Sequence, residues 1–173
     1  MNWLTTWFGQ PEHVEIAVAA AAAIVMLGAG GALTDIGPWY NQLRKPNWQP
    51  PGWLFPLAWT TIFALATFAG VKSWDAASSF AEHAVVIGLF ALNGALNILW
   101  SLLFFRLQRP DWALIEVVAL WLSILALILG LAPLSVRSSL ALLPYLLWVS
   151  FAAMLNRTVV RLNSPFGRVA VSR

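Results

Sequence analysis

Five long apolar runs alternate with polar connections along this 173-residue chain. Each run is close to the roughly 20 residues that an α-helix needs to cross a bilayer. The runs predict membrane-spanning helices over residues 14–33, 53–71, 83–105, 112–131 and 139–160. Three of the four connections are short, and short loops join antiparallel neighbours. The pattern therefore predicts an all-α integral membrane protein, folded as a single five-transmembrane-helix bundle.

Composition supports a membrane protein. Hydrophobic residues make up 60% of the chain and charged residues 10%, and the mean hydropathy is +0.75, far from the balance of a soluble domain. At this length we expect one domain over residues 1–173. Helical bundles belong in an inner or plasma membrane, because outer-membrane spanners are β-barrels. No Lys or Arg precedes the first apolar run, so we expect that helix to remain in the mature protein.

The ten Lys and Arg residues predict the orientation of the bundle. Lys72 and Arg137 fall on one side of the predicted membrane. The other eight fall on the opposite side: Arg44, Lys45, Arg106, Arg109, Arg157, Arg161, Arg168 and Arg173. The positive-inside rule then puts the N-terminus outside and the C-terminus in the cytoplasm. These cations form no dense run, so we predict no nucleic-acid partner.

Metal and catalytic motifs are missing from the sequence. It has no cysteine, which excludes disulfides and thiolate metal sites. Its two histidines, His13 and His83, fall at the outer ends of their predicted helices, opposite the long first connection. We find no catalytic triad, carboxylate pair or phosphate-binding glycine loop. The sequence therefore predicts no catalytic constellation, no metal and no obligatory cofactor.

The most distinctive stretch runs from Trp39 to Thr60 and reads WYNQLRKPNWQPPGWLFPLAWT. It contains four tryptophans, a tyrosine and four prolines. One interpretation is an interfacial aromatic belt, which occurs in many membrane proteins. A belt needs no prolines, however, whereas prolines fix backbone angles and oppose ordinary helix. We therefore favour a preorganised loop over residues 34–52 that covers a ligand.

Polar and aromatic residues mark two of the later helices. Asn93, Asn97 and Trp100 share one face of the third predicted helix. Asn93 is best explained as interhelical glue, whereas Asn97 fits glue and pocket lining equally well. In the fifth helix, Trp148 lies one turn before the small Ala152, which leaves room for a flat guest. Ordinary core packing is the alternative there.

Two carboxylates fall inside the predicted spans, Glu15 and Glu116. Each lies within about one turn of a span end, where a long side chain reaches the interface. We expect Glu116 to pair with Arg106 or Arg109 across the short third loop. That role would be structural.

Small residues favour close helix contacts at two places. Gly28, Gly30 and Gly31 in the first helix suggest close packing against a neighbour. In the third helix the small pairs are Ala84 with Gly88, and Ala91 with Ala95. Such ridges let two backbones approach closely. We predict homodimerisation through this helix, with packing inside the same bundle as an equally good alternative.

Together these residues resemble the TspO/translocator protein family, the tryptophan-rich sensory proteins once called peripheral benzodiazepine receptors. The matching pattern is Trp39-Tyr40, Leu43, Lys45-Pro46, Trp48, Pro50-Pro51, Trp53, Phe55-Pro56, Trp59-Thr60, Asn97-x-x-Trp100-Ser101, Phe104-Phe105, Pro144-Tyr145-x-x-Trp148 and Asn156. The resemblance runs from about Gly28 to Asn163. Three motifs in the right order make it highly specific.

The resemblance implies a five-helix bundle whose first loop folds over a pocket for porphyrins, haem and benzodiazepine-type drugs. By position, the implied ligand-binding residues are Tyr40, Pro50, Trp59, Asn97, Trp100, Trp148 and Ala152. One departure matters, because the sterol-recognition pattern of animal members requires a basic residue soon after a tyrosine. Here Tyr145 is followed by no Lys or Arg until Arg157. We therefore expect no tight cholesterol binding by that route.

Three classes of function remain. The favoured one is a tetrapyrrole- and benzodiazepine-binding protein that acts as a sensor, sequestering factor or transport helper in stress-linked tetrapyrrole regulation. The second is an enzyme that degrades porphyrins with light or oxygen, in which Trp59 and Trp148 would carry the chemistry. The third is a small-molecule transporter, which the odd helix number and the missing intramembrane charge relay disfavour.

Overall fold

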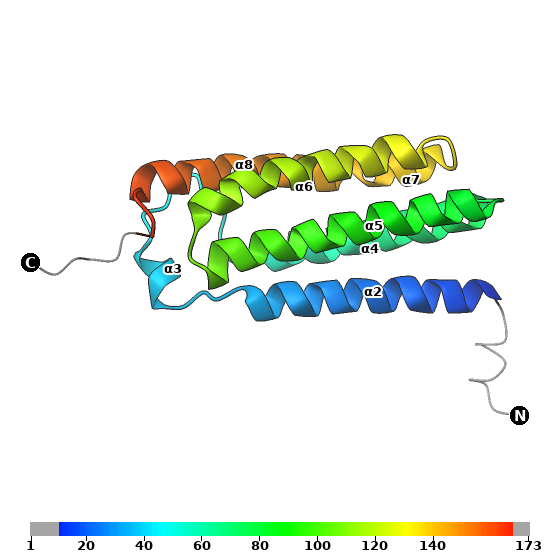
Figure 1. Ribbon diagram of the computed structural model, residues 1–173. Coiled ribbons are helices and arrows are strands. Elements are labelled where there is room, and N and C mark those ends of the chain that lie inside the picture. Colours follow the sequence, from blue (N-terminus) through cyan, green and yellow to red (C-terminus); the bar gives the residue numbers. More distant parts are fainter. Residues whose placement is uncertain (1–10, 168–173) are drawn as a thin grey trace, which may run out of the picture.

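The computed structural model describes residues 11–167, and within this range every regular element is a helix (Figure 1). The elements are α2 (Pro11–Leu33), α3 (Pro38–Gln42), α4 (Leu54–Ala76), α5 (Phe80–Ser101), η1 (Leu102–Arg106), α6 (Pro110–Leu131), α7 (Val136–Ala141) and α8 (Leu143–Asn163). The first ten residues, the side chains of His13 and Glu15, and both Arg168 and Arg173 lie outside the description. Predictions that fall on those groups stay predictions.

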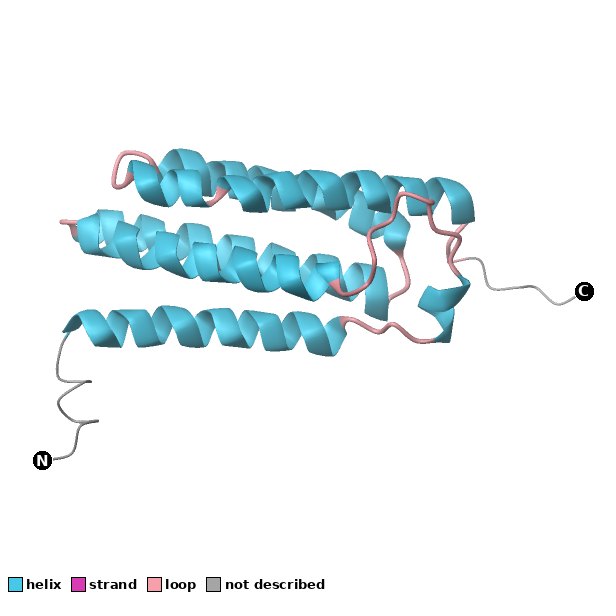
Figure 2. Ribbon diagram, turned by 180° about the vertical axis from the view of Figure 1, so that it is seen from behind, coloured by secondary structure: helices cyan, strands magenta, loops and turns pink. Residues whose placement is uncertain are grey.

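The long helices run side by side along one axis (Figures 1 and 2). Helix α2 packs against α4 and α5, α5 packs against α6, and α6 packs against α8. Helix α4 completes the ring by contacting α7 and α8. The short helix α3 and the loops around it lie at the end of the bundle where α8 finishes (Figure 2).

Four helical segments are long and apolar enough to cross a membrane: Leu54–Ala76, Phe80–Arg106, Pro110–Leu131 and Val136–Asn163. They cover the last four predicted spans except for Trp53, which lies just before α4, and they make the chain an integral membrane protein. The helix that contains the first predicted span, α2, is 23 residues long. By the same criteria its apolar part, Ala19–Leu33, is shorter than a span.

Local sequence signals explain several helix ends. At the start of α5, the Ser79 hydroxyl accepts a hydrogen bond from the Glu82 amide (3.2 Å), and the Glu82 carboxylate accepts one from the Ser79 amide (3.0 Å). Proline occupies the first turn of α3, α6 and α8, where a missing N–H costs nothing. The third predicted helix ends as η1, a π-helical turn of the kind that often occurs at functional sites.

Helix α6 is the most buried helix in the bundle. Ala113, Leu120, Ile124, Leu127 and Leu131 form its inner stripe, and each is at most 2% exposed. This stripe repeats at three and four residues, as expected for a helix that faces neighbours on one side. The packing fixes α5 and α8 on either side of α6.

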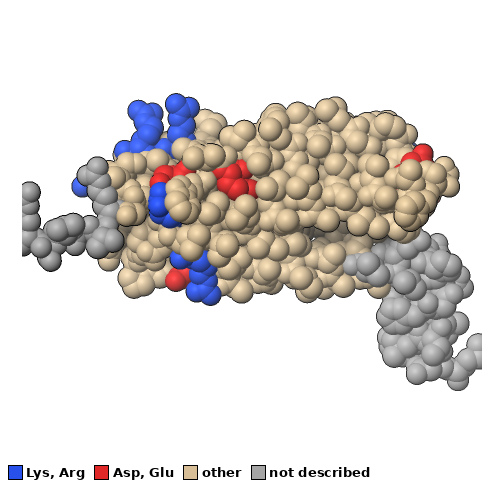
Figure 3. All heavy atoms as spheres, viewed as in Figure 1, with Lys and Arg blue, Asp and Glu red and all other residues tan. Residues whose placement is uncertain are grey.

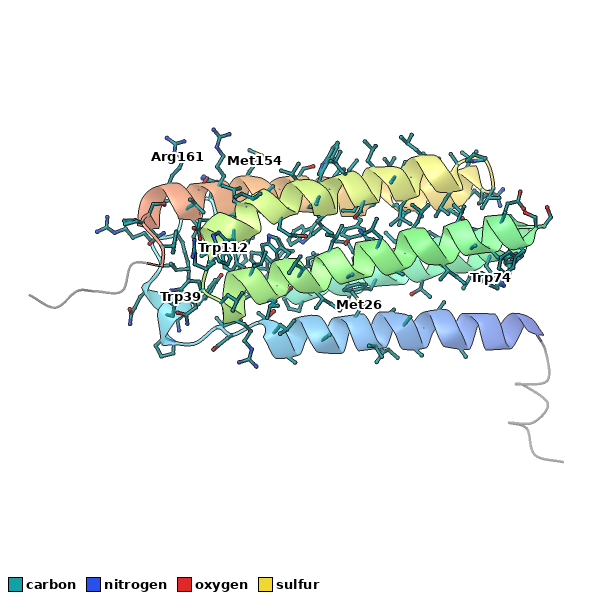
Figure 4. The ribbon with its side chains drawn as sticks, in the orientation of Figure 1. Met26, Trp39, Trp74, Trp112, Met154 and Arg161 are labelled. Carbon is teal, nitrogen blue, oxygen red and sulfur yellow. The ribbon has the colours of Figure 1, made fainter. Side chains whose placement is uncertain are left out.

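Charge gathers at the end of the bundle that holds α3 (Figure 3). Arg44, Lys45, Arg106, Arg109 and Arg161 belong to segments that meet at this end. On α8, the exposed Arg161 and Met154 point away from the bundle (Figure 4). Trp39 lies at this end and Trp74 at the other, so aromatic side chains mark both ends of the spans (Figure 4).

The prediction of close helix packing at Gly28, Gly30 and Gly31 is wrong. A Cβ atom added to any of the three would meet nothing within 4 Å. The backbone of α2 is therefore not pressed against a neighbour at these positions. Gly30 and Gly31 instead face a cavity, described below.

The position of the small residues on α5 contradicts one of the two interpretations given for them. Ala84, Gly88, Ala91 and Ala95 are all exposed on the outside of the bundle, and a Cβ at Gly88 would meet nothing within 4 Å. Packing inside the same bundle is thus wrong for this ridge. No neighbour among the described residues covers it.

Candidate ligand-binding cavity

A cavity of about 660 Å³ lies at the α3 end of the bundle, among the helices and beneath the first loop. This volume is in the range of roughly 300–1,000 Å³ that small-molecule sites occupy. Four long helices, η1 and the loop supply its walls. The lining residues are Met26, Gly30, Gly31, Thr34, Ile36, Tyr40, Leu43, Lys45, Gln49, Gly52, Phe55, Pro56, Trp59, Thr60, Phe63, Asn97, Trp100, Ser101, Phe104, Phe105, Trp148, Ala152, Leu155, Asn156 and Val159.

Aromatic rings dominate these walls, and they brace one another. Trp148 meets Phe55 edge-on with ring centres 5.7 Å apart. Trp59 stacks on Phe63 at 5.6 Å, and Trp100 stacks on Phe104 at 5.1 Å. Offset-stacked and edge-on pairs are the favoured aromatic geometries. A flat aromatic guest would therefore meet ring faces that are already held in place.

The first loop is tied to the C-terminal end of α8. The Arg44 amide donates to the Asn163 side-chain oxygen (2.8 Å), and the Asn163 side-chain nitrogen donates to the Arg44 carbonyl (2.8 Å). The ring of Trp48 in the loop also packs against Phe151 of α8 at 5.9 Å. These contacts hold the loop over the cavity.

Lys45 and Tyr40 form the rim of the cavity. The Lys45 ammonium lies 3.9 Å from the centre of the Tyr40 ring, a cation–π contact. Partial burial raises the pKa of the Tyr40 hydroxyl, so the neutral phenol is favoured. Lys45 is the one charged side chain among the described residues that line the cavity. The rim therefore offers a cation to a ligand carboxylate while the interior stays apolar.

A buried polar network lies behind the inner wall. Asn97 donates to the Tyr145 hydroxyl (3.0 Å), which donates to the Asn93 side-chain oxygen (3.2 Å). Asn93 donates to Ser123 (2.9 Å). The network links α5, α6 and α8, so the prediction of Asn93 as interhelical glue is confirmed. Asn97 both joins this network and lines the cavity, which reconciles its two interpretations.

The structure brings six of the seven predicted site residues to one cavity: Tyr40, Trp59, Asn97, Trp100, Trp148 and Ala152. Pro50 does not line it and instead lies in the loop beside Gln49, which does. Whether these side chains bind a ligand stays a prediction. Met26, Gly30 and Gly31 of α2 and Thr34 just after it also line the cavity, although none of them was predicted to bind a ligand. The glycine cluster was the available signal, but it was interpreted as a helix contact.

The predicted pairing of Glu116 with Arg106 or Arg109 is wrong. Both carboxylate oxygens of Glu116 are buried and have no hydrogen-bond partner within the described part of the chain. Arg109 instead donates to the Asp111 carboxylate through Nε (2.8 Å), which raises the pKa of its guanidinium. Arg106 donates to the Ala32 carbonyl (3.3 Å). Asp111 is only two residues from Arg109 and lies at the start of α6, whereas Glu116 is seven residues away. Arg109 therefore pairs with Asp111.

Comparison with known proteins identifies a matching family and several relatives. The sequence profile of the TspO/MBR family matches residues 16–162. The chain is 37% identical over 146 residues to Protein CrtK of Rhodobacter capsulatus, covering 84% of this chain and 89% of that protein. It is 42% identical over 125 residues to the tryptophan-rich protein TspO of Chlorobaculum tepidum, covering 72% and 79%. It is also 36% identical over 126 residues to the translocator protein of Sus scrofa, covering 72% and 75%.

Proposed function

The chain belongs to the TspO/MBR family, and on that premise we propose that its cavity binds flat aromatic small molecules, with porphyrin-type tetrapyrroles and haem as the main class and benzodiazepine-type compounds as a second. The bound molecule is a ligand and no obligatory cofactor. In the cell the protein acts as a sensor, sequestering factor or transport helper in tetrapyrrole regulation.

One observation carries this proposal: an apolar, ring-lined cavity with a cationic rim. Protoporphyrin IX and haem each combine an apolar macrocycle with two propionates, which need water or cations. The macrocycle would enter between Trp59 of α4 and Trp148 of α8, which both line the cavity. Its propionates would remain near Lys45 and the exposed Arg44. The site thus matches both parts of the ligand.

The proposal also includes the membrane arrangement. We take α2 as the fifth spanning helix, because it is 23 residues long and packs beside α4 and α5. Its N-terminus then lies outside an inner or plasma membrane, and the loop and the C-terminal end of α8 face the cytoplasm. The cavity rim would meet tetrapyrroles from the cytoplasmic side.

Fluorescence quenching by protoporphyrin IX tests the proposed function. The Trp59→Ala, Trp148→Ala double variant should bind it more than about tenfold more weakly, since each ring contact contributes roughly 0.5–1.5 kcal/mol beyond area burial. Trp112→Ala is the matched control, because Trp112 stacks on Arg109 away from the cavity. Wild-type affinity in the double variant would place the porphyrin elsewhere.

A second candidate function is light- or oxygen-dependent porphyrin degradation, because two oxidisable indoles, Trp59 and Trp148, line the same cavity. Illumination of the purified protein with protoporphyrin IX distinguishes the two functions. Protein-dependent loss of the Soret band that slows in Trp148→Phe would indicate an enzyme. A stable band in both proteins would leave binding alone.

A further inference from the structure

The hydrogen-bond network behind the cavity has a direction, and that direction begins at a backbone carbonyl. The Ser123 hydroxyl donates to the Leu120 carbonyl at 2.7 Å. A carbonyl oxygen only accepts, and a serine hydroxyl has one proton to give. The Ser123 oxygen can therefore only accept from its other neighbour, Asn93, whose side-chain nitrogen lies 2.9 Å away. This fixes which end of the Asn93 amide faces α6.

The order continues across the bundle. With its nitrogen toward Ser123, Asn93 presents its oxygen to the Tyr145 hydroxyl at 3.2 Å, and the hydroxyl must donate there. Tyr145 has then used its one proton, so its oxygen accepts from the Asn97 nitrogen at 3.0 Å. Each group is buried, where an unmatched pair of acceptors would be costly. The Asn97 amide therefore has one allowed orientation.

That orientation leaves the side-chain oxygen of Asn97 available at the cavity. Asn97 is 6% exposed and lines the cavity. No hydrogen bond within the described part of the chain uses this oxygen. Tyr145 is 3% exposed and does not line the cavity, so it acts on a ligand only through Asn97.

We propose that Asn97 is a hydrogen-bond acceptor for an N–H or O–H group on the edge of the bound ligand, and that Tyr145 is the positioning residue that keeps the acceptor end of its amide toward the cavity. This rests on the proposed function, since it concerns the same cavity. It makes the site selective within flat heteroaromatic ligands: a lactam or pyrrole with a free edge N–H binds better than its N-alkylated form.

The test compares two probes of nearly equal shape. One is 2-quinolone, a flat two-ring lactam with a single edge N–H, and the other is its N-methyl form, which has no N–H. Wild-type protein should bind the N–H form about three- to tenfold more tightly, the usual range for one hydrogen bond. Tyr145→Phe and Asn97→Ala should each bring this ratio close to one. Trp148→Ala should weaken both probes and preserve the ratio.

The outcomes separate the two proposals. If Trp148→Ala weakens neither probe, the cavity is not the site and the proposed function fails. If it weakens both, but the wild type shows no preference or Tyr145→Phe keeps it, the role of Asn97 and Tyr145 is overturned. Where Tyr145→Phe yields no folded protein by circular dichroism, Asn97→Ala decides alone, and an unchanged ratio overturns the proposal.

Discussion

Glu116 is the least satisfied side chain in the described part of the bundle. It is 9% exposed, and neither carboxylate oxygen has a partner. Its neighbours on the inner stripe of α6, Ala113 and Leu120, are apolar. A buried polar group without a hydrogen bond lowers stability by about 1–3 kcal/mol. Glu116 is therefore expected to lower the stability of this bundle.

Replacing Glu116 by leucine should raise the free energy of unfolding by about 1–3 kcal/mol, because it removes unpaired oxygens and adds apolar surface. Unfolding in mixed micelles by a denaturing detergent measures this. Asn93→Leu is the matched control and should have the opposite effect, since it breaks satisfied hydrogen bonds to Ser123 and Tyr145. A less stable Glu116→Leu protein would show that the carboxylate has a partner after all.

For single residues, the sequence predicted the helix face of a side chain better than it predicted the residue that the side chain contacts. The spacing of Asn93, Asn97 and Trp100 placed all three toward the interior, because a helix repeats every 3.6 residues whatever surrounds it. Tyr145, the partner of both asparagines, lies about 50 residues away in the chain. Which residues meet depends on the rotation of α8 against α5. A single sequence does not encode that rotation in any local pattern.

At the scale of the elements, the position of the first loop depends on a small number of contacts. It carries α3, and it is joined to α8 by the two hydrogen bonds between Arg44 and Asn163. Both bonds use one side chain on the helix and backbone groups on the loop. Removing that side chain should loosen the loop without altering the cavity walls, since Asn163 does not line the cavity.

Asn163→Ala should therefore increase amide hydrogen exchange at Arg44 by about tenfold, the effect of losing roughly 1.5 kcal/mol of local protection. Porphyrin dissociation should become faster in parallel. Asn41→Ala is the control, because the Asn41 side chain donates a hydrogen bond to the Ile36 carbonyl at its own end of the loop. Unchanged exchange at Arg44 would mean that other contacts, such as Trp48 against Phe151, hold the loop.

Most of the helices could be predicted from the sequence. Apolar length determines a spanning helix, so the later four spans agree with the structure to within a few residues at most ends. The end of α5 and the π-turn at η1 could not be predicted from the sequence. In the structure Phe104 and Phe105 of this turn pack with Trp100, and such contacts have no local sequence pattern. The prediction of close packing at the glycines of α2 was wrong for a related reason. Small residues permit close helix contact, but they also leave room for a cavity.

For the whole molecule, charge asymmetry predicts one orientation in the membrane. Arg44, Lys45, Arg106 and Arg109 belong to the α3 end, whereas Lys72 and Arg137 belong to the other. A phosphatase that is active only outside the cytoplasm, fused to the C-terminus, should therefore be inactive. The same enzyme fused to the N-terminus should be active. The reverse pattern would place the cavity rim on the outer side.

The exposed ridge of α5 predicts how two copies of the chain associate. Ala84, Gly88, Ala91 and Ala95 present a flat strip to the membrane, and small residues let helices approach closely enough for van der Waals contact and lipid release to drive pairing. Leucine at Gly88 meets nothing inside its own bundle within 4 Å of the new Cβ. Bulk added there should hinder a second copy without disturbing the fold.

The Gly88→Leu, Ala91→Leu double variant should accordingly shift the detergent-solubilised protein from dimer to monomer in multi-angle light scattering. Porphyrin affinity should stay within about twofold, because Asn97 and Trp100 lie further along α5 and face the cavity. Ala64→Leu provides the matched control, an equally exposed small-to-large change on α4 that leaves the ridge intact. A double variant that remains dimeric would exclude this face of α5 from the interface, and dissociation by Ala64→Leu alone would assign the interface to α4.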